Sequence, residues 1–283
     1  MILVTGATGQ LGQLVIQSLL KKVPANQIVA AVRNPAKAEN LKSLGIQIRK
    51  ADYNDASSWP TAFEGITKLL LISGSEVGTR VQQHKNVIDA AKKYGKLELL
   101  AYTSILHADT SSLILAQEHK ETEKLIKDSR IRYSLLRNGW YTENYVGTVK
   151  SAVEHGAVFG STKEGRISSA SREDYAEAAA QVLTMKDPQP VYELAGDTSY
   201  SLSELATEIS KQSGKEVKYN DLPENDYKAV LVKVGLPEGF AGVLAQSDAA
   251  AAQGGLFDES HQLSQLIGRK TTPMVTTLAA FLK

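Results

Sequence analysis

Three glycines follow one another at three-residue steps near the start of the chain, in the stretch "VTGATGQLGQLV" at 4–15. The short apolar run before them predicts a buried strand. After them, the apolar residues of 10–20 recur at three- and four-residue steps, which predicts a helix. A strand, a glycine turn and a helix in this order are typical of a site that binds the pyrophosphate of a dinucleotide at the start of the helix.

Each glycine has its own expected role in such a turn. Gly6 permits the sharp change of direction, Gly9 lets a pyrophosphate approach the backbone, and Gly12 lets the helix pack closely. The spacing differs by one residue from G-x-G-x-x-G, and a purely structural turn is the alternative. The flanking strand and helix favour the dinucleotide interpretation.

The end of the second predicted strand, in "AAVRNPAK", indicates which dinucleotide is bound. Enzymes that prefer NAD place an acid there for the ribose 2′-hydroxyl, whereas those that prefer NADP offer an arginine to the 2′-phosphate. Arg33 occupies this position and Lys37 follows closely. The alternative is a solvated arginine at the start of a helix. NADP is therefore favoured.

Small polar residues follow the next three predicted strands. Asp52 could accept a hydrogen bond from the adenine amino group, or it could cap a helix that begins near Ser57. The fourth and fifth strands end in further candidates for cofactor contacts, which are Ser73, Gly74, Ser75, Thr103 and Ser104. Each could belong to an ordinary turn. Their shared position at strand ends favours a site.

Strand-like and helical patterns alternate through the first half of the chain. Strands are expected at 27–33, 46–49, 68–73, 97–104 and 131–137. This alternation predicts an α/β fold with a doubly wound parallel sheet of six strands in the order 3-2-1-4-5-6. The pattern changes near residue 150. We expect a dinucleotide-binding domain at 1–150 and a smaller α/β domain at 151–283 that covers the substrate, with some segments crossing back to the sheet.

Composition limits the classes of partner and compartment. The net charge of +1 in 283 residues gives no electrostatic reason to expect nucleic acid or a membrane surface as a partner. The absence of cysteine excludes disulfides and thiolate ligands and fits the cytoplasm. The first strand is expected at residue 2, which leaves no room for a secretory leader, and no apolar run reaches membrane-spanning length. The five histidines are not at ligand spacings, so no metal site is predicted.

Several longer motifs make a family resemblance specific. The stretches "TGATGQLG", "VRNPAKA", "ADYND", "NVIDAAKKYG", "EHKETEKLI" and "LLRNGWYTENY" resemble the NmrA-like branch of the atypical short-chain dehydrogenases. The match is closest to its bacterial NADPH-dependent quinone oxidoreductases and extends to "YELAGD" and "GGLFD". The resemblance implies a Rossmann domain with a small C-terminal domain, NADPH between them and a quinone above the nicotinamide. Whether the chain forms a homodimer is left open at this point.

Carried over by position, the resemblance also implies cofactor contacts. The loop would consist of Gly6, Ala7, Thr8, Gly9, Gln10 and Leu11, with Arg33 on the 2′-phosphate. The nicotinamide end would be held by Arg137, Asn138, Gly139, Trp140, Tyr141 and Thr142. The cluster of amides and aromatic rings in "RNGWYTENY", directly after the sixth strand, independently suits a planar ring. An aromatic plug between domains is the alternative.

The chain lacks the pair of catalytic residues that typical short-chain reductases use. No tyrosine has a lysine four residues after it, and His119 and Glu123 occupy the two positions on the helix where that pair would lie. Residues four apart share a helix face, so the two could meet and keep the imidazole protonated. The other interpretation is a helix residue that faces the crevice without an essential role in proton transfer.

The missing pair indicates the kind of acceptor. Ketone reduction yields a basic alkoxide that needs a positioned acid, whereas quinone reduction yields an anion that water can protonate. We therefore expect a quinone in an apolar slot, and the candidate residues that line this slot are Tyr141, Tyr145, Phe240 and Phe257. Reduction of an enone or imine cannot be separated from this by sequence. A regulatory sensor that binds the dinucleotide without turnover is the alternative from another class.

Overall fold

The computed structural model describes residues 1–283, which form two compact units. The first unit consists of 1–108, 117–138 and 172–193, and the second of 109–116, 139–171 and 194–283. The chain therefore passes between the units several times. It returns to the first unit because the last strand of the sheet begins at Val191, well beyond residue 150.

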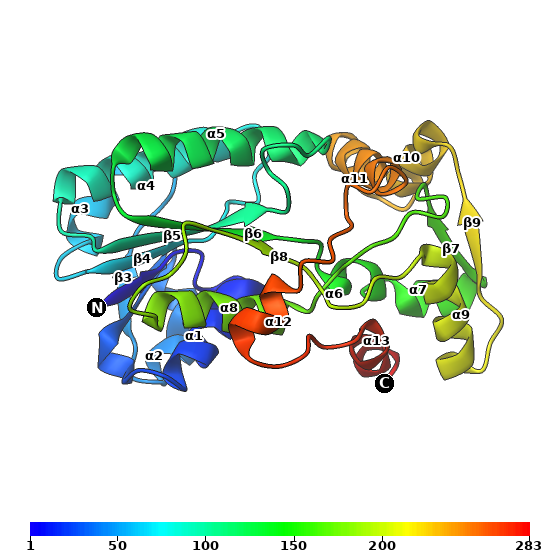
Figure 1. Cartoon of the computed structure of the whole chain (residues 1–283), viewed down its shortest axis with the longest axis horizontal. Coiled ribbons are helices and arrows are strands. Elements are labelled where there is room, and N and C mark those ends of the chain that lie inside the picture. The colour runs from blue at the N-terminus through cyan, green and yellow to red at the C-terminus, as the bar shows by residue number, and fades with distance from the viewer. The chain divides into compact units, whose positions relative to one another are not determined.

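The first unit is built on a seven-stranded sheet with the order β3-β2-β1-β4-β5-β6-β8 (Figure 1). Its strands are β1 (Ile2–Val4), β2 (Ile28–Val32), β3 (Gln47–Lys50), β4 (Lys68–Leu71), β5 (Leu99–Ile105), β6 (Tyr133–Asn138) and β8 (Val191–Leu194). The pairs from β3 to β6 are all parallel. Strands β1, β2 and β5 are buried along their whole length, because helices cover both faces. The predicted order of six strands and the doubly wound parallel fold are confirmed.

The seventh strand was not expected from the sequence. Strand β8 lies beside β6 at the edge of the sheet. The Leu135 amide donates to the Pro190 carbonyl at 2.8 Å and the Gly139 amide to the Leu194 carbonyl at 2.7 Å. These two bonds advance in the same direction along both segments, so β8 is parallel to β6. Because this strand is short and alternates between buried and half-buried residues, its apolar pattern is weak.

Helices cover both faces of this sheet. Figure 1 shows α3 (Trp59–Ala62), α4 (Arg80–Tyr94) and α5 (Ile114–Ser129) on one face, and α1 (Gln10–Leu20), α2 (Glu39–Lys42) and α8 (Arg172–Thr184) on the other. The predicted helix at 10–20 is confirmed. Three short 3₁₀ helices complete the unit, namely η1 (Ala25–Gln27), η2 (Pro35–Ala38) and η3 (Ala56–Ser58). On the first face, Trp59, Phe63 and Tyr102 are fully buried in the hydrophobic core.

The second unit has a two-stranded parallel sheet of β7 (Ala157–Gly160) and β9 (Lys218–Asp221). Its helices are α6 (Thr142–Val146), α7 (Val149–His155), α9 (Leu202–Ser213), α10 (Glu224–Lys233), α11 (Glu238–Ala251), α12 (Gln262–Ile267) and α13 (Met274–Leu282). Helix α9 begins with a capping box, in which Ser201 Oγ accepts from the Glu204 amide at 3.2 Å and Glu204 Oε2 accepts from the Ser201 amide at 2.8 Å. Arg166 Nη1 also donates to both Glu204 carboxylate oxygens at 3.0 Å, so a local cap and a distant arginine together fix the start of this helix.

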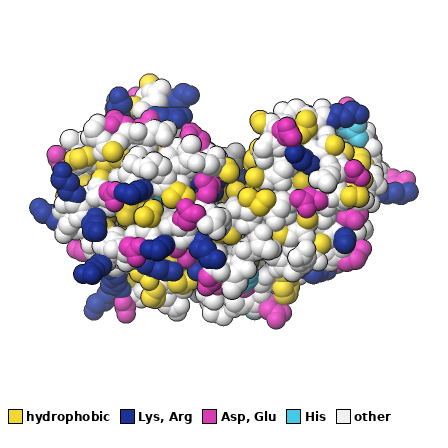
Figure 2. Space-filling model, turned by 90° about the horizontal axis from the view of Figure 1, so that it is seen from above, with side chains coloured by type: hydrophobic (Ala, Val, Ile, Leu, Met, Phe, Trp, Pro, Cys, Tyr) yellow, Lys and Arg dark blue, Asp and Glu magenta, His cyan; other side chains and the backbone are white.

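The surface is mixed in charge. Figure 2 shows basic and acidic side chains interspersed over the visible face, with no continuous basic stripe. This agrees with the net charge of +1. No helix has both the length and the apolar character needed to cross a membrane.

Candidate functional site

The glycine turn after β1 is tightly packed against the start of α1. Gly6 has a φ of +58°, a left-handed conformation that glycine adopts without strain. A Cβ atom on Gly12 would lie 2.3 Å from the Gly6 carbonyl oxygen and 2.8 Å from Ala7 Cα. Gly6 therefore allows the sharp turn and Gly12 allows close packing, as expected. The close approach of Gly12 is to the backbone of the turn at Gly6 and Ala7.

The N-terminus of α1 has open hydrogen-bonding capacity. Gly9 is its N-cap, no side chain caps it, and its first turn holds no acidic residue. The first amides of a helix have no intrahelical partner and lie at its positive end, so an anion is favoured there. Thr8, Gly9 and Gln10 are exposed, whereas the side chains of Ala7 and Leu11 are buried. This cradle fits a pyrophosphate held mainly by backbone groups.

Arg33 follows β2 directly and is accessible. Its side chain is 71% exposed, and the nearest carboxylate oxygen, on Glu76, lies 4.0 Å from its guanidinium. Asn34, and not Arg33, caps η2, because its Oδ1 accepts from the Ala36 amide at 3.0 Å. Lys37 is exposed on the same short helix. Arg33 is thus accessible from solvent, and a contact with a 2′-phosphate stays a prediction.

A tyrosine hydroxyl joins the ends of the central strands. Tyr53 Oη lies 2.6 Å from both Thr5 Oγ1 and the Ile72 carbonyl oxygen. Thr5 Oγ1 also accepts from the Ile72 amide at 2.9 Å. Burial raises the pKa of Tyr53 well above its usual value, so the hydroxyl stays protonated. Sequence reasoning missed Tyr53, although it stands next to Asp52 in the quoted motif "ADYND".

Asp52 does not cap the following helix. Its Oδ1 accepts from the Asn54 amide at 2.9 Å, within its own turn. The cap of η3 is Asp55, whose Oδ1 accepts from the Ser57 amide at 3.0 Å. The alternative expectation for Asp52 was therefore wrong, because a second aspartate lies closer to the helix. A contact between Asp52 and an adenine stays a prediction.

The loop after β4 is fixed by residues from outside it. The Ser73 amide donates to Thr103 Oγ1 at 2.8 Å. The Gly74 amide donates to His84 Nε2 at 2.9 Å, and the Gly74 carbonyl accepts from Arg80 Nε at 2.6 Å. Burial, and then the charge of Arg80, lowers the pKa of His84 to about 3, so the ring is neutral and can accept. Ser75 is exposed beside this fixed backbone.

His84 and Arg80 were not identified from the sequence. Both lie on α4, and both are buried. The only available signal was a histidine and an arginine four residues apart at the start of a helix, and their target is a backbone group that no pattern reveals. They act as supports for the strand-end loop that includes Ser73, Gly74 and Ser75.

Arg137 lies in a buried ion pair. Its Nε and Nη2 donate to the two carboxylate oxygens of Glu123 at 2.9 and 2.8 Å, and its Nη1 donates to Glu193 at 2.7 Å. Arg137 is only 4% exposed. Ser104 Oγ also donates to Glu123, at 2.7 Å. Arg137 and Ser104 were expected to face the cofactor, but these bonds direct both polar groups to Glu123.

His119 and Glu123 do not form the expected pair. His119 Nδ1 lies 2.8 Å from Tyr102 Oη, whereas Glu123 binds Arg137 and Ser104. Burial lowers the pKa of His119 well below its usual value, and the charge of Arg80 adds to this. The imidazole is therefore neutral and not kept protonated. Glu123 instead pairs with the Arg137 guanidinium, and His119 pairs with the Tyr102 hydroxyl.

The end of β6 offers one unsatisfied acceptor. Asn138 is 6% exposed, and its Oδ1 is buried without a hydrogen-bond partner. Buried polar atoms are rarely left unpaired, so this oxygen has unused capacity to accept a bond. The carboxyl ends of the strands are where open α/β sheets bind ligands, so this oxygen is available at a ligand-binding edge.

The residues after Asn138 are bonded within the second unit. The Trp140 carbonyl accepts from the Ala170 amide at 3.2 Å, and the Thr142 amide donates to the Ala170 carbonyl at 2.9 Å. Thr142 Oγ1 lies 2.8 Å from Ser169 Oγ. Together with the bond of Gly139 to Leu194, these contacts hold the segment in one conformation.

The four proposed substrate residues have different surroundings. On α6, the Tyr145 hydroxyl donates to Asp248 Oδ1 at 3.0 Å. Asp248 is 4% exposed, and burial raises its pKa to about 6. Phe240, on α11, is 51% exposed, while Tyr141 and Phe257 are half-buried.

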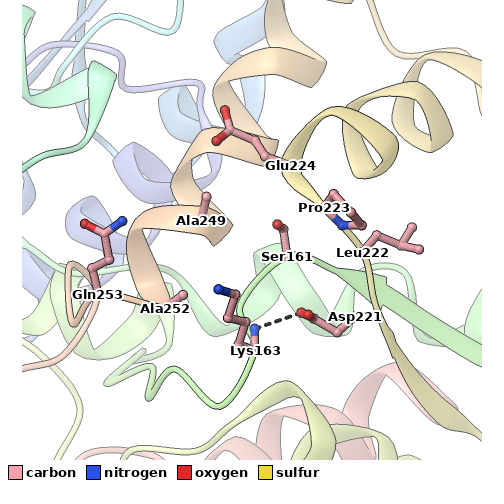
Figure 3. A pocket seen from close by; sticks show the side chains of 9 residues that line it. All are labelled: Ser161, Lys163, Asp221, Leu222, Pro223, Glu224, Ala249, Ala252 and Gln253. Carbon is pink, nitrogen blue, oxygen red and sulfur yellow. Dashed lines mark hydrogen bonds between the residues drawn. The ribbon is translucent and has the colours of Figure 1, made fainter.

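The second unit also has a pocket of about 480 Å³ (Figure 3). It lies where β7 and β9 end and is lined by Ser161, Lys163, Asp221, Leu222, Pro223, Glu224, Ala249, Ala252 and Gln253. The Lys163 amide donates to Asp221 Oδ1 at 2.8 Å. None of the proposed substrate residues lines this pocket, and its lining residues include charges of both signs.

Comparisons with known proteins reveal relatives along the whole chain. The model of the NmrA-like family matches residues 1–282. Quinone oxidoreductase 2 of Escherichia coli (strain K12) is 56% identical over 280 residues, which cover 99% of this chain and 98% of that protein. The crystal structure of the E. coli NADPH-dependent quinone oxidoreductase complexed with NADPH has a TM-score of 0.98 at 55% identity and covers 100% of both chains. Triphenylmethane reductase of Citrobacter sp., complexed with NADP(H), has a TM-score of 0.94 at 40% identity over 99% of this chain and 100% of that chain.

Proposed function

The chain belongs to the NmrA-like family, and on that premise we propose that it is an NADPH-dependent oxidoreductase that transfers hydride to a quinone. The observation that carries the proposal is the full-length similarity to a quinone oxidoreductase, with a glycine turn and an accessible arginine in the first unit. The absence of cysteine supports a reducing compartment, and we place the enzyme in the cytoplasm.

The residues of the first unit suit NADPH. The uncapped start of α1 would bind the pyrophosphate, and Arg33 would bind the 2′-phosphate. Asp52 and the loop after β4 would contact the adenine end, and Asn138 Oδ1 would accept from the nicotinamide amide. NADPH, when bound, supplies the hydride.

The proton needs no dedicated side chain. His119 is buried, neutral and bonded to Tyr102, which makes it a poor acid at neutral pH. A quinone accepts hydride to give a phenolate-like anion, and water can protonate this anion. The chain then has only to place the acceptor and to bind the cofactor.

The test is NADPH oxidation by the purified protein with and without a simple benzoquinone, corrected for the uncatalysed reaction and repeated with NADH. We expect protein-dependent oxidation that requires the quinone and is faster with NADPH. Tight NADPH binding without turnover of a quinone, enone or imine would contradict the proposal and indicate a sensor. Turnover of an enone or imine, but not of a quinone, would correct the acceptor alone.

A further inference from the structure

Glu76 lies next to Arg33, the residue that we propose binds the 2′-phosphate of the cofactor. Glu76 Oε1 lies 4.0 Å from Arg33 Nη1, and the two side chains are 53% and 71% exposed. Glu76 belongs to the loop after β4, whereas Arg33 follows β2. The positive group for a 2′-phosphate therefore has an acidic neighbour contributed by a different strand end.

A hydrogen bond from helix α4 restrains the Glu76 side chain. Its second oxygen, Oε2, accepts a hydrogen bond from Gln83 Nε2 at 2.9 Å. Gln83 lies on α4 and is only 3% exposed, and its Nε2 also lies 3.2 Å from Asn54 Oδ1. A buried amide thus restrains the carboxylate, which differs in this respect from a freely rotating surface acid.

We propose that Glu76 limits the preference for NADPH over NADH by competing with the 2′-phosphate for Arg33. A phosphate monoester carries up to two negative charges near neutral pH, so a carboxylate fixed at the same guanidinium opposes its binding. NADH lacks this phosphate and does not meet the opposition. The inference rests on the proposed function, because it assigns Arg33 to the cofactor.

The experiment compares dissociation constants for NADPH and NADH by isothermal titration calorimetry, in the absence of any quinone. Glu76→Gln keeps the side-chain shape and can still accept from Gln83. We expect NADPH to bind about threefold to fivefold more tightly, as removal of an exposed charge contact allows. NADH binding should change less than about twofold. The gain should shrink at high salt, because the groups are exposed.

Glu39→Gln is the matched control. It removes the same charge from an exposed position on α2, where Glu39 has only Lys42 as an ion partner, at 3.8 Å. This variant should leave the ratio of the two constants unchanged. An equal gain in Glu39→Gln would show a general charge effect and would overturn the inference.

A second arm uses the Arg33→Ala background. If Glu76 competes for Arg33, Glu76→Gln should no longer tighten NADPH binding once the arginine is absent. An unchanged NADPH constant in the single variant, or equal tightening of both cofactors, overturns the inference while the proposed function stands. Wild-type protein that binds neither dinucleotide overturns both.

Discussion

Two arginines stand at strand ends of the same sheet and differ in what surrounds them. Arg33, after β2, is 71% exposed and has one carboxylate at 4.0 Å. Arg137, at the end of β6, is 4% exposed and bonded to Glu123 and Glu193. The first can bind an anion from solution, whereas the second already has its anions in the protein. Residue type and position at a strand end are therefore not enough to identify a ligand contact.

The same distinction separates the polar groups of the candidate site. The first amides of α1 have no side-chain cap and Asn138 Oδ1 has no hydrogen-bond partner, so a ligand can use these groups. Ser104 is bonded to Glu123 and His119 to Tyr102, so these side chains support the fold. Unused hydrogen-bonding capacity in the folded chain is the better guide to a binding group.

The largest effect is expected from removal of the buried arginine. Arg137→Met leaves the buried Glu123 with only Lys127 Nζ, at 3.5 Å, as a cation, which should lower the free energy of unfolding by about 3 kcal/mol. Chemical unfolding monitored by circular dichroism measures this. Arg132→Met is the control, because Arg132 is half exposed and pairs with the exposed Asp187, so its cost should be about 1 kcal/mol or less. Stable Arg137→Met protein that no longer binds NADPH would instead show that Arg137 is a cofactor residue.

Asp248 extends the comparison to a buried acid without a cation. It receives hydrogen bonds from the Tyr145 hydroxyl and the Ser161 amide, and burial raises its pKa from 3.8 to about 6. The protonated form is thus favoured in the folded state. Stability contributed by this group is present below pH 3.8 and is lost as pH rises through 6. The loss amounts to about 3 kcal/mol.

Asp248→Asn should remove that pH dependence. Unfolding free energies of wild type and variant, measured between about pH 4 and 8, should converge on the acid side and differ in favour of the variant above pH 6. The difference between the two curves isolates Asp248 from other titrating groups. Parallel curves over the whole range would show that Asp248 is charged in the folded protein at all these pH values.

Sequence patterns predicted the helices and strands whose apolar residues recur regularly along the chain. The helix at 10–20 and the five later strands follow from apolar patterns, and the order of the first six strands follows from their alternation with helices. The partners of Arg137 could not be predicted, because Glu193 is 56 residues away on a strand with a weak pattern. His119 and Glu123 matched the spacing of a helix pair, but spacing alone says nothing of Tyr102.

The exposed arginine should show a smaller and more selective effect than the buried one. Arg33→Ala should raise the Michaelis constant for NADPH at least about tenfold, a loss of about 1.4 kcal/mol, because the contact with the 2′-phosphate is lost. The constant for NADH should change little, and unfolding should be nearly unaffected. Steady-state kinetics with both cofactors measure this. Equal changes for NADPH and NADH would remove Arg33 from the 2′-phosphate.

The smallest effect on turnover is expected at His119, whose ring is neutral and bonded to Tyr102. His119→Gln keeps a group that can bond the tyrosine but cannot act as an acid near neutral pH. If water protonates the reduced quinone, kcat should stay within about threefold of wild type, whereas loss of a general acid costs about 10²-fold or more. Thermal unfolding serves as the control for folding. A fall of that size in a well-folded variant would make His119 an acid and place it with Arg33 among the groups that act on ligands.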